Sequence, residues 1–166
     1  MSKTQEDLKA AFAGESQANR KYLAFAKKAE EEGKPGLAKL FRVAAEGETV
    51  HALNHLQASG GIKSTKENLE AAIAGETYEI EKMYPEFLED AKAEGIKAAE
   101  ISFQGALKVE GVHQDLFNLA LEKLELGEDV SDEEYYICPV CGYPAIGAAP
   151  DNCPVCNTPG EKFYTA

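Results

Sequence analysis

The chain lacks the features that mark membrane proteins and nucleic-acid-binding proteins. No apolar run approaches the ~20 residues needed to span a bilayer, and no charged-then-apolar signal segment opens the sequence. Basic residues are few: 17 Lys and Arg stand against 29 Asp and Glu among 166 residues, for a net charge of −12. This balance disfavours nucleic acid and anionic membranes as partners. We therefore expect a cytoplasmic protein that binds neither.

Cysteine is also scarce, and its distribution excludes a framework of disulfides. All four cysteines lie between Cys138 and Cys156, as two C-x-x-C pairs. Disulfides that staple a fold are spread along it, whereas closely spaced pairs in a reducing compartment are typical of a metal site. The sequence therefore predicts a metal centre with four cysteine ligands.

What the sequence does contain is an internal repeat. Ala-Gly-Glu-Ser at residues 13–16 recurs as Ala-Gly-Glu-Thr at 74–77, and Glu-Thr-Val-His at 48–51 recurs as Glu-Gly-Val-His at 110–113. The first pair is offset by 61 positions and the second by 62. A single Glu-x-x-His is a weak signal in so acidic a chain. Two motifs repeated together, in the same order, indicate a ligand set for two metal ions.

Helical spacing of apolar residues, from about residue 4 to residue 126, predicts four long helices of roughly 24 to 30 residues, each ~35–45 Å long. Thr4-x-x-Asp7 and Ser64-x-x-Glu67 are typical of capping boxes at the start of the first and third helices. Pro35 suits the first turn of the second helix. Short breaks make consecutive helices antiparallel, so two helical hairpins should form a four-helix bundle. The breaks lie at residues 33–36, 59–61 and 95.

Glutamate and histidine occupy positions on these helices where apolar residues belong. The inward face of the second helix, for example, runs through Leu37, Phe41, Ala44, Glu48 and His51. A buried, unpaired carboxylate costs several kcal/mol and would normally take up a proton instead. Several such carboxylates that converge inside a bundle therefore require cations.

The third helix departs from the repeat and carries a surplus carboxylate. Glu79 stands three residues after Glu76, where the first repeat has alanine, and the spacing from Glu to the next inward Tyr grows from seven residues to eight. An inserted residue is commonly absorbed as a π-bulge, and such bulges favour functional sites. A regular helix would also resist Pro85, which follows. The sequence predicts a π-bulge between Glu76 and Pro85.

Carboxylate-rich sites with one imidazole per ion suit iron or manganese better than zinc. The ligand pattern matches ferritin-like di-iron and di-manganese proteins, in which two helices give a Glu and two give a Glu-x-x-His. We therefore expect two non-haem irons, with manganese and zinc as alternative occupants. Glu48 and Glu110 should bridge them.

The acidic residues 128–134 predict a linker between the bundle, residues 1–127, and a small module, residues 135–166. A module of about 30 residues cannot fold on apolar burial alone, so bound metal must supply much of its folding free energy. Its cysteines suit either a structural zinc or a one-electron iron centre.

The string from Tyr136 to Tyr143, Tyr-Ile-Cys-Pro-Val-Cys-Gly-Tyr, resembles rubredoxin and favours iron in the module. The chain as a whole resembles the rubrerythrin family, a ferritin-like di-iron bundle followed by a rubredoxin-like domain. The resemblance covers essentially all 166 residues. The di-iron ligands that it implies are Glu15, Glu48, His51, Glu76, Glu79, Glu110 and His113, and those of the third iron are Cys138, Cys141, Cys153 and Cys156.

The resemblance also implies roles for individual side chains. One iron would move between Glu79 in the oxidised state and His51 in the reduced state, since diferric iron favours an anionic ligand. Tyr22 and Tyr84 would hydrogen-bond to ligating carboxylates, with aromatic packing alone as the alternative. His55 has no Glu three residues before it and is expected to be a helix-face residue.

The implied activity is reduction of hydrogen peroxide to water, in defence against oxidative stress. Electrons from NAD(P)H would arrive through a rubredoxin or reductase partner and pass through the cysteine-bound iron to the di-iron site. The helices are long and no tryptophan is present to relay electrons, so we expect a homodimer that places one subunit's module against the other's bundle. Head-to-tail docking and helix swapping across the 59–64 loop both satisfy this expectation.

Four other functions are alternatives to this one. Iron oxidation and storage is disfavoured because storage needs no one-electron input at each turnover. Oxygen reduction at the same centre differs from peroxidase action in substrate preference alone. A non-enzymatic scaffold with a structural zinc would show no peroxide turnover. Oxidation of organic substrates is less favoured, since the extra carboxylate leaves fewer open coordination positions.

Overall fold

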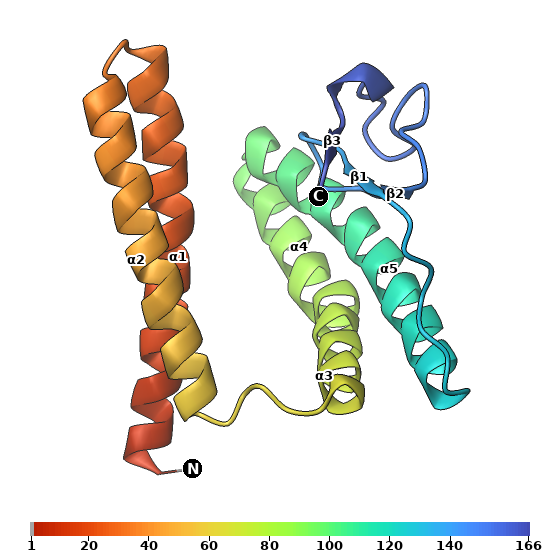
Figure 1. The fold of residues 1–166 in the computed structure, drawn as a ribbon. Helices are drawn as coiled ribbons and strands as arrows, with labels where there is room; N and C mark the ends of the chain where they lie inside the picture. Colours follow the sequence, from red (N-terminus) through yellow and green to blue (C-terminus); the bar gives the residue numbers. More distant parts are fainter. Residues whose placement is uncertain (1) are drawn as a thin grey trace. The chain divides into compact units, whose positions relative to one another are not determined.

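The computed structural model describes residues 2–166, which form two compact units that divide between Lys63 and Ser64 (Figure 1). Each unit carries one copy of the sequence repeat. Long helices dominate both, as the sequence predicts. No helix among residues 2–166 combines the length and the apolar character that crossing a bilayer requires.

The first unit is a hairpin of two long helices, α1 (Lys3–Glu31) and α2 (Pro35–Ala58). Pro35 lies in the first turn of α2, as predicted. Small side chains fill the seam between the helices, which allows the two backbones to approach closely. The buried seam residues are Ala26, Ala29, Ala38, Ala45 and Ala52.

The start of α1 differs from the prediction. Ser2 is the N-cap, and its hydroxyl accepts a hydrogen bond from the backbone N–H of Gln5 at 3.3 Å. The serine satisfies one of the free N–H groups of the first turn, so the helix begins ahead of Thr4. The predicted capping box from Thr4 to Asp7 is therefore wrong.

The second unit opens with a long helix in three parts, and the middle part confirms the predicted π-bulge. The segment η1 (Glu79–Met83) is a π-helical turn between α3 (Thr65–Tyr78) and α4 (Tyr84–Glu94). Residues on both sides of η1 keep right-handed helical dihedral angles, so the chain continues as one helix. Pro85 falls in the first turn of α4, next to the bulge.

Both ends of this long helix have a defined cap. The capping box predicted at Ser64 is confirmed: its hydroxyl accepts from the Glu67 N–H at 3.3 Å, and the Glu67 carboxylate accepts from the Ser64 N–H at 3.2 Å. At the other end, Gly95 has a φ of 71°, a left-handed conformation that glycine adopts without strain. The turn leads into α5 (Lys97–Glu125), which packs against α3 and α4.

The remaining residues form a small sheet module. Its strands are β1 (Tyr135–Ile137), β2 (Pro144–Ile146) and β3 (Tyr164–Thr165), in the antiparallel order β2-β1-β3. A short 3₁₀ turn, η2 (Gly160–Lys162), precedes β3. Residues 128–134, between α5 and β1, form no helix or strand.

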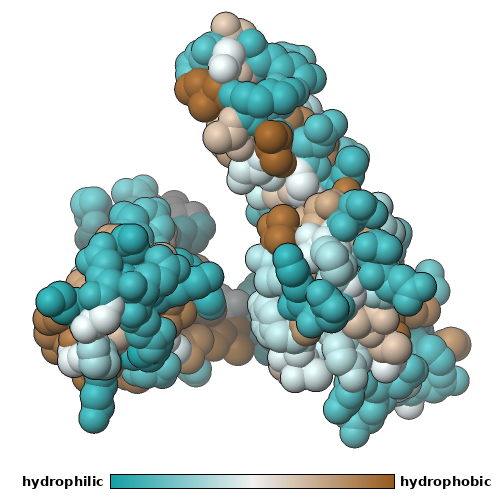
Figure 2. Space-filling view, turned by 90° about the horizontal axis from the view of Figure 1, so that it is seen from above, coloured by the Kyte–Doolittle hydropathy of each residue, from teal (hydrophilic) through white to brown (hydrophobic). Residues whose placement is uncertain are grey.

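Both helical hairpins expose large apolar side chains, and hydrophobic residues interrupt the hydrophilic surface in Figure 2. On α2, Leu40 and Val43 are each 62% exposed, and Val50 is 57% exposed. These positions follow a spacing of three and seven residues and so lie along one stripe of the helix. We call Leu40, Val43 and Val50 the α2 stripe. An exposed apolar surface of this kind is typical of a face that packs against another molecule or domain.

Candidate metal centres

The first hairpin brings together one group of candidate ligands. Glu15 of α1 and Glu48 and His51 of α2 have ligand atoms that all lie within 4.8 Å of one another. Nδ1 of His51 lies 3.0 Å from Oε2 of Glu48 and 3.9 Å from Oε1 of Glu15. Glu48 and His51 share a helix face because residues three apart are neighbours on an α-helix.

The second hairpin repeats this arrangement. Glu76 of α3 and Glu110 and His113 of α5 again have ligand atoms within 4.8 Å of one another. Nδ1 of His113 lies 2.8 Å from Oε2 of Glu110 and 3.9 Å from Oε1 of Glu76. The repeat in the sequence is thus a repeat in geometry. Two carboxylates and one imidazole in each group are hard oxygen and nitrogen donors that fit an iron ion.

The surplus carboxylate lies close to the second group but is not part of it. Glu79, the first residue of η1, is absent from the cluster of atoms within 4.8 Å. Burial, followed by the negative charge of Glu110, raises the pKa of Glu79, while His113 lowers it. Burial and then the charge of Glu110 also raise the pKa of Glu76, and the charge of Glu79 raises it further, while His113 lowers it. Carboxylates that hinder one another's ionisation in this way gain from a bound cation.

Each hairpin also contains a cluster of three aromatic rings. Ring centroids are 6.3 Å apart for Tyr22 and Phe25, 6.3 Å for Tyr22 and Phe41, and 5.6 Å for Phe25 and Phe41. The rings 62 positions later, Tyr84, Phe87 and Phe103, repeat this pattern at 6.4, 6.3 and 5.4 Å. The π turn η1 absorbs the inserted residue, so the second cluster has the same arrangement as the first.

Tyr84 is linked to the candidate ligands as well as to the rings. Burial raises the pKa of the Tyr84 phenol, and the charge of Glu110, with which it shares a hydrogen bond, raises it further. The aromatic packing expected from the sequence is present at Tyr84, and its role toward a ligating carboxylate stays a prediction. Tyr22 packs against the rings of Phe25 and Phe41.

Polar side chains that the sequence did not identify as functional tie each hairpin together near its group. The Asn19 amide donates to the Ala45 carbonyl and to the Thr49 hydroxyl, both at 2.8 Å. In the second hairpin the Gln114 amide donates to the Thr77 hydroxyl at 2.7 Å. The signal available in the sequence was the inward position of Asn19, one turn from Glu15. These bonds hold the helices at the level of the ligands.

The four cysteines also form a cluster. Sγ of Cys138 lies 3.5 Å from Sγ of Cys156, and Sγ of Cys141 lies 3.5 Å from Sγ of Cys153. All four are free thiols. A tetrahedral ion with bonds of ~2.3 Å to sulfur holds its ligands about 3.8 Å apart, so the cluster fits one four-coordinate metal.

The surroundings of the four sulfurs are not equal. Burial raises the pKa of Cys141. Burial acts on Cys156 in the same direction, but hydrogen bonds from the Thr158 hydroxyl and N–H, together with those from the Cys138 and Cys141 thiols, outweigh it and lower the pKa of Cys156 to about 6. The cluster also borders α5: a hollow of about 430 Å³ between helix and module includes Ile101, Val140, Cys141 and Cys156 in its wall.

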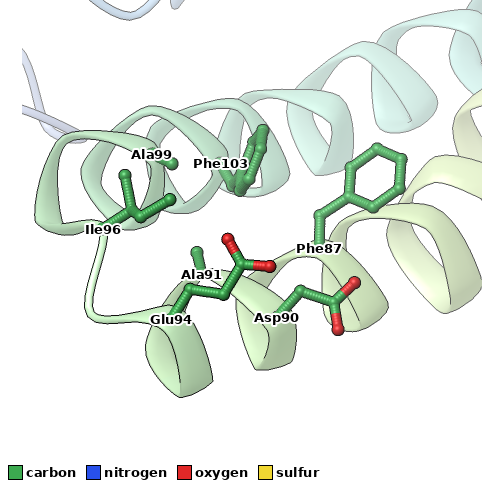
Figure 3. A pocket seen from close by; sticks show the side chains of 7 residues that line it. All are labelled: Phe87, Asp90, Ala91, Glu94, Ile96, Ala99 and Phe103. Atoms are coloured by element: carbon green, nitrogen blue, oxygen red, sulfur yellow. The ribbon is translucent and has the colours of Figure 1, made fainter.

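A different hollow, of about 290 Å³, lies where α4 and α5 meet. Figure 3 shows the rings of Phe87 and Phe103, with the carboxylates of Asp90 and Glu94 beside them. No histidine or cysteine lines it, and His55 likewise lies outside every ligand group found among residues 2–166.

Comparison with known proteins agrees with this geometry. Residues 6–121 match the family described as Rubrerythrin, and residues 136–164 match the one described as Rubrerythrin, rubredoxin-like domain. The chain belongs to the rubrerythrin family. It is 34% identical to Rubrerythrin-2 of Clostridium acetobutylicum, over 96% of this chain and 95% of the relative. It is 38% identical to Rubrerythrin of Porphyromonas gingivalis, over 98% of this chain and 89% of the relative.

A solved structure of nigerythrin matches with a TM-score of 0.57 and 33% identity, over 100% of this chain and 88% of that one. The rubrerythrin resemblance and the fold class, a ferritin-like arrangement of two helical hairpins with a small rubredoxin-like module, are therefore confirmed. The chain is a di-iron oxidoreductase of oxidative-stress defence, with a further metal site at the four cysteines.

Proposed function

We propose that this rubrerythrin is a peroxidase that reduces hydrogen peroxide to water at its di-iron centre. One observation carries the proposal: two matching Glu, Glu, His groups occur in the same chain as a four-cysteine cluster suited to a one-electron iron centre. The two groups would hold a pair of ferrous ions, which would supply the two electrons that cleavage of the O–O bond requires, and Cys138, Cys141, Cys153 and Cys156 would hold the iron that returns electrons one at a time.

The proposed ligands of the di-iron centre are the two groups together with Glu79. In each group the glutamate three residues before the histidine lies within hydrogen-bonding distance of Nδ1, at 3.0 Å for Glu48 and 2.8 Å for Glu110. That contact fixes the orientation of the imidazole ring. Glu79 has no counterpart in the first group, and we propose that it exchanges with His51 as a ligand of one iron.

Tyr84 is proposed to hold a proton close to the reacting oxygen atoms. Its raised pKa keeps the phenol protonated at neutral pH, so it can donate to Glu110. Proton transfer from a positioned side chain typically contributes about 10²–10⁴-fold to a reaction rate. Tyr22 is proposed to hydrogen-bond to a ligating carboxylate of the first group.

Electrons are proposed to come from NAD(P)H through a reductase or a rubredoxin-type donor in the cytoplasm. We further propose a homodimer, with helix swapping and head-to-tail docking as its two forms. The exposed α2 stripe supports a second copy as the partner, since its apolar side chains are costly to leave in water. The mass of the protein in dilute solution, from light scattering, tests this directly.

Stopped-flow absorbance tests the activity. Anaerobically reduced, iron-loaded protein is mixed with one equivalent of hydrogen peroxide and, separately, with oxygen. Fast oxidation of the di-iron centre by peroxide, followed by oxidation of the cysteine-bound iron, is the expected result. Fast reaction with oxygen and slow reaction with peroxide would replace the peroxidase by a ferroxidase or oxygen reductase. Absence of both reactions would indicate a scaffold.

A further inference from the structure

The two C-x-x-C turns of the module are close copies of each other. In each, the residue after the second cysteine has a positive φ, 84° for Gly142 and 61° for Asn157. In each, that residue's N–H donates to the carbonyl of the first cysteine, at 3.0 Å in one turn and 2.9 Å in the other. The next residue, Tyr143 or Thr158, accepts from the first cysteine's N–H, at 3.0 and 2.8 Å.

The copies differ in the side chain at that last position. Oγ1 of Thr158 lies 3.0 Å from Sγ of Cys156, whereas the first turn has a tyrosine there. Thr158 is a buried polar residue, only 8% exposed. A thiolate bound to metal carries no proton, so the hydroxyl must be the donor in the metal-loaded protein.

We propose that the Thr158 hydroxyl raises the reduction potential of the cysteine-bound iron by donating a hydrogen bond to the Cys156 sulfur. Hydrogen bonds to the sulfur ligands are one of the levers by which a protein sets the potential of an iron–sulfur site. The reduced centre carries one more negative charge than the oxidised centre. A donor aimed at one of its sulfurs therefore stabilises the reduced state more.

The consequence for turnover concerns both electron transfers. A higher potential makes this iron a better acceptor from the electron donor and a weaker donor to the di-iron centre. Thr158 thus sets how the driving force is divided between the two transfers. The inference rests on the proposed presence of iron at the four cysteines, but it does not depend on peroxide as substrate.

The test is an anaerobic spectroelectrochemical titration of the full-length, iron-loaded protein, followed through the iron–thiolate absorption bands. Thr158→Val removes the hydroxyl and keeps the shape of the side chain. We expect its midpoint potential to fall by on the order of tenfold in the equilibrium constant, ~59 mV for a one-electron couple. Thr158→Ser, which restores a hydroxyl, should return the potential most of the way to that of the wild type.

Tyr143→Phe is the matched control, because it removes a hydroxyl from the equivalent position of the other turn. Its potential should equal that of the wild type. An unchanged potential in Thr158→Val would overturn the proposal, and so would an equal fall in Thr158→Ser, which would assign the effect to packing. If the valine variant fails to hold iron, Thr158→Ala takes its place in the comparison with serine. Loss of peroxide activity with the expected potentials would count against the peroxidase alone.

Discussion

The two helical hairpins of this rubrerythrin have the same ligand geometry but different surroundings. The contacts from histidine to glutamate differ by 0.2 Å or less between them, at 3.0 and 3.9 Å in one and 2.8 and 3.9 Å in the other. The side chain of His51 is 58% exposed, however, and that of His113 is 34% exposed. The histidine of the first hairpin is thus the more exposed of the two, and that of the second lies beside half-buried carboxylates.

The second hairpin is also where the repeat has changed. It has the π turn η1, the surplus Glu79 and the carboxylates with raised pKa values. A single inserted residue accounts for the π turn, and the helix and the aromatic cluster beyond it keep their register. The comparison teaches that the ligand pattern tolerates little change, whereas a helix can absorb an insertion next to it. Four experiments test whether the two hairpins are equivalent.

Removal of a ligand from either hairpin should have the largest effect. If both groups serve one di-iron centre, Glu48→Ala and Glu110→Ala should each lower peroxide turnover by more than about 100-fold, since even residues outside the ligand set contribute 10–100-fold. Iron content by atomic spectroscopy should fall in both variants. Two retained irons and normal turnover in either variant would break the equivalence of the hairpins. The exposed Glu46→Ala on α2 is the control.

Removal of the unmatched carboxylate should have a smaller effect. Glu79→Gln is expected to retain both irons and to lower peroxide turnover by roughly tenfold, because it takes away the proposed exchanging ligand but none of the matched ones. Steady-state turnover and the visible spectrum of the oxidised protein measure this. Glu81→Gln, an exposed residue in the same π turn, should behave as the wild type. Wild-type turnover in Glu79→Gln would contradict the proposed role of Glu79 as an exchanging ligand.

The polar ties between helices give a stability test of the same comparison. Asn19→Ala breaks two hydrogen bonds across the first hairpin, and Gln114→Ala breaks one across the second. At about 1 kcal/mol for each bond, the free energy of unfolding should fall by about 2 and about 1 kcal/mol. Urea denaturation of the metal-free protein provides both values. A larger loss in Gln114→Ala would reverse the expected order.

The pH dependence of the metal-free protein should show the smallest difference. The folded state raises the pKa of Glu76 and Glu79 above the value of about 4.5 that an unfolded carboxylate has. Each group therefore contributes stability that is present below that value and is lost as the pH rises through the folded pKa. Relative to Glu79→Gln, the wild-type melting temperature should fall more steeply above pH 4.5. Parallel curves of melting temperature against pH for the two proteins would contradict the raised pKa of Glu79.

Much of the structure could be predicted because it depends on local spacing. Residues three apart share a face of any helix, which is why Glu48 and His51 lie together as expected. The spacing of seven and then eight residues between Glu and Tyr revealed η1, since an α-helix can absorb an extra residue in few other ways. The error at Thr4 arose because two nearby side chains were able to cap the same helix. Only the folded chain shows that Ser2 does so.

Other features depend on side chains that meet from distant positions. Nothing in the spacing of Thr158 reveals that its hydroxyl faces Cys156, because many side chains at that position would satisfy the same backbone turn. The amide ties of Asn19 and Gln114 also required both helices of each hairpin to be in place. These contacts give the two C-x-x-C turns, and the two hairpins, their separate properties.

The sequence by itself determined the number of metal sites, the residue types of their ligands and the class of helical fold. Those properties follow from helical periodicity and from the cost of burying charge, which act along one chain segment at a time. Only the tertiary structure decided how buried each ligand is, which carboxylates raise one another's pKa and which sulfur receives a hydroxyl. Burial and hydrogen bonding across elements depend on distances in space, and those distances exist only once the helices and the module have packed.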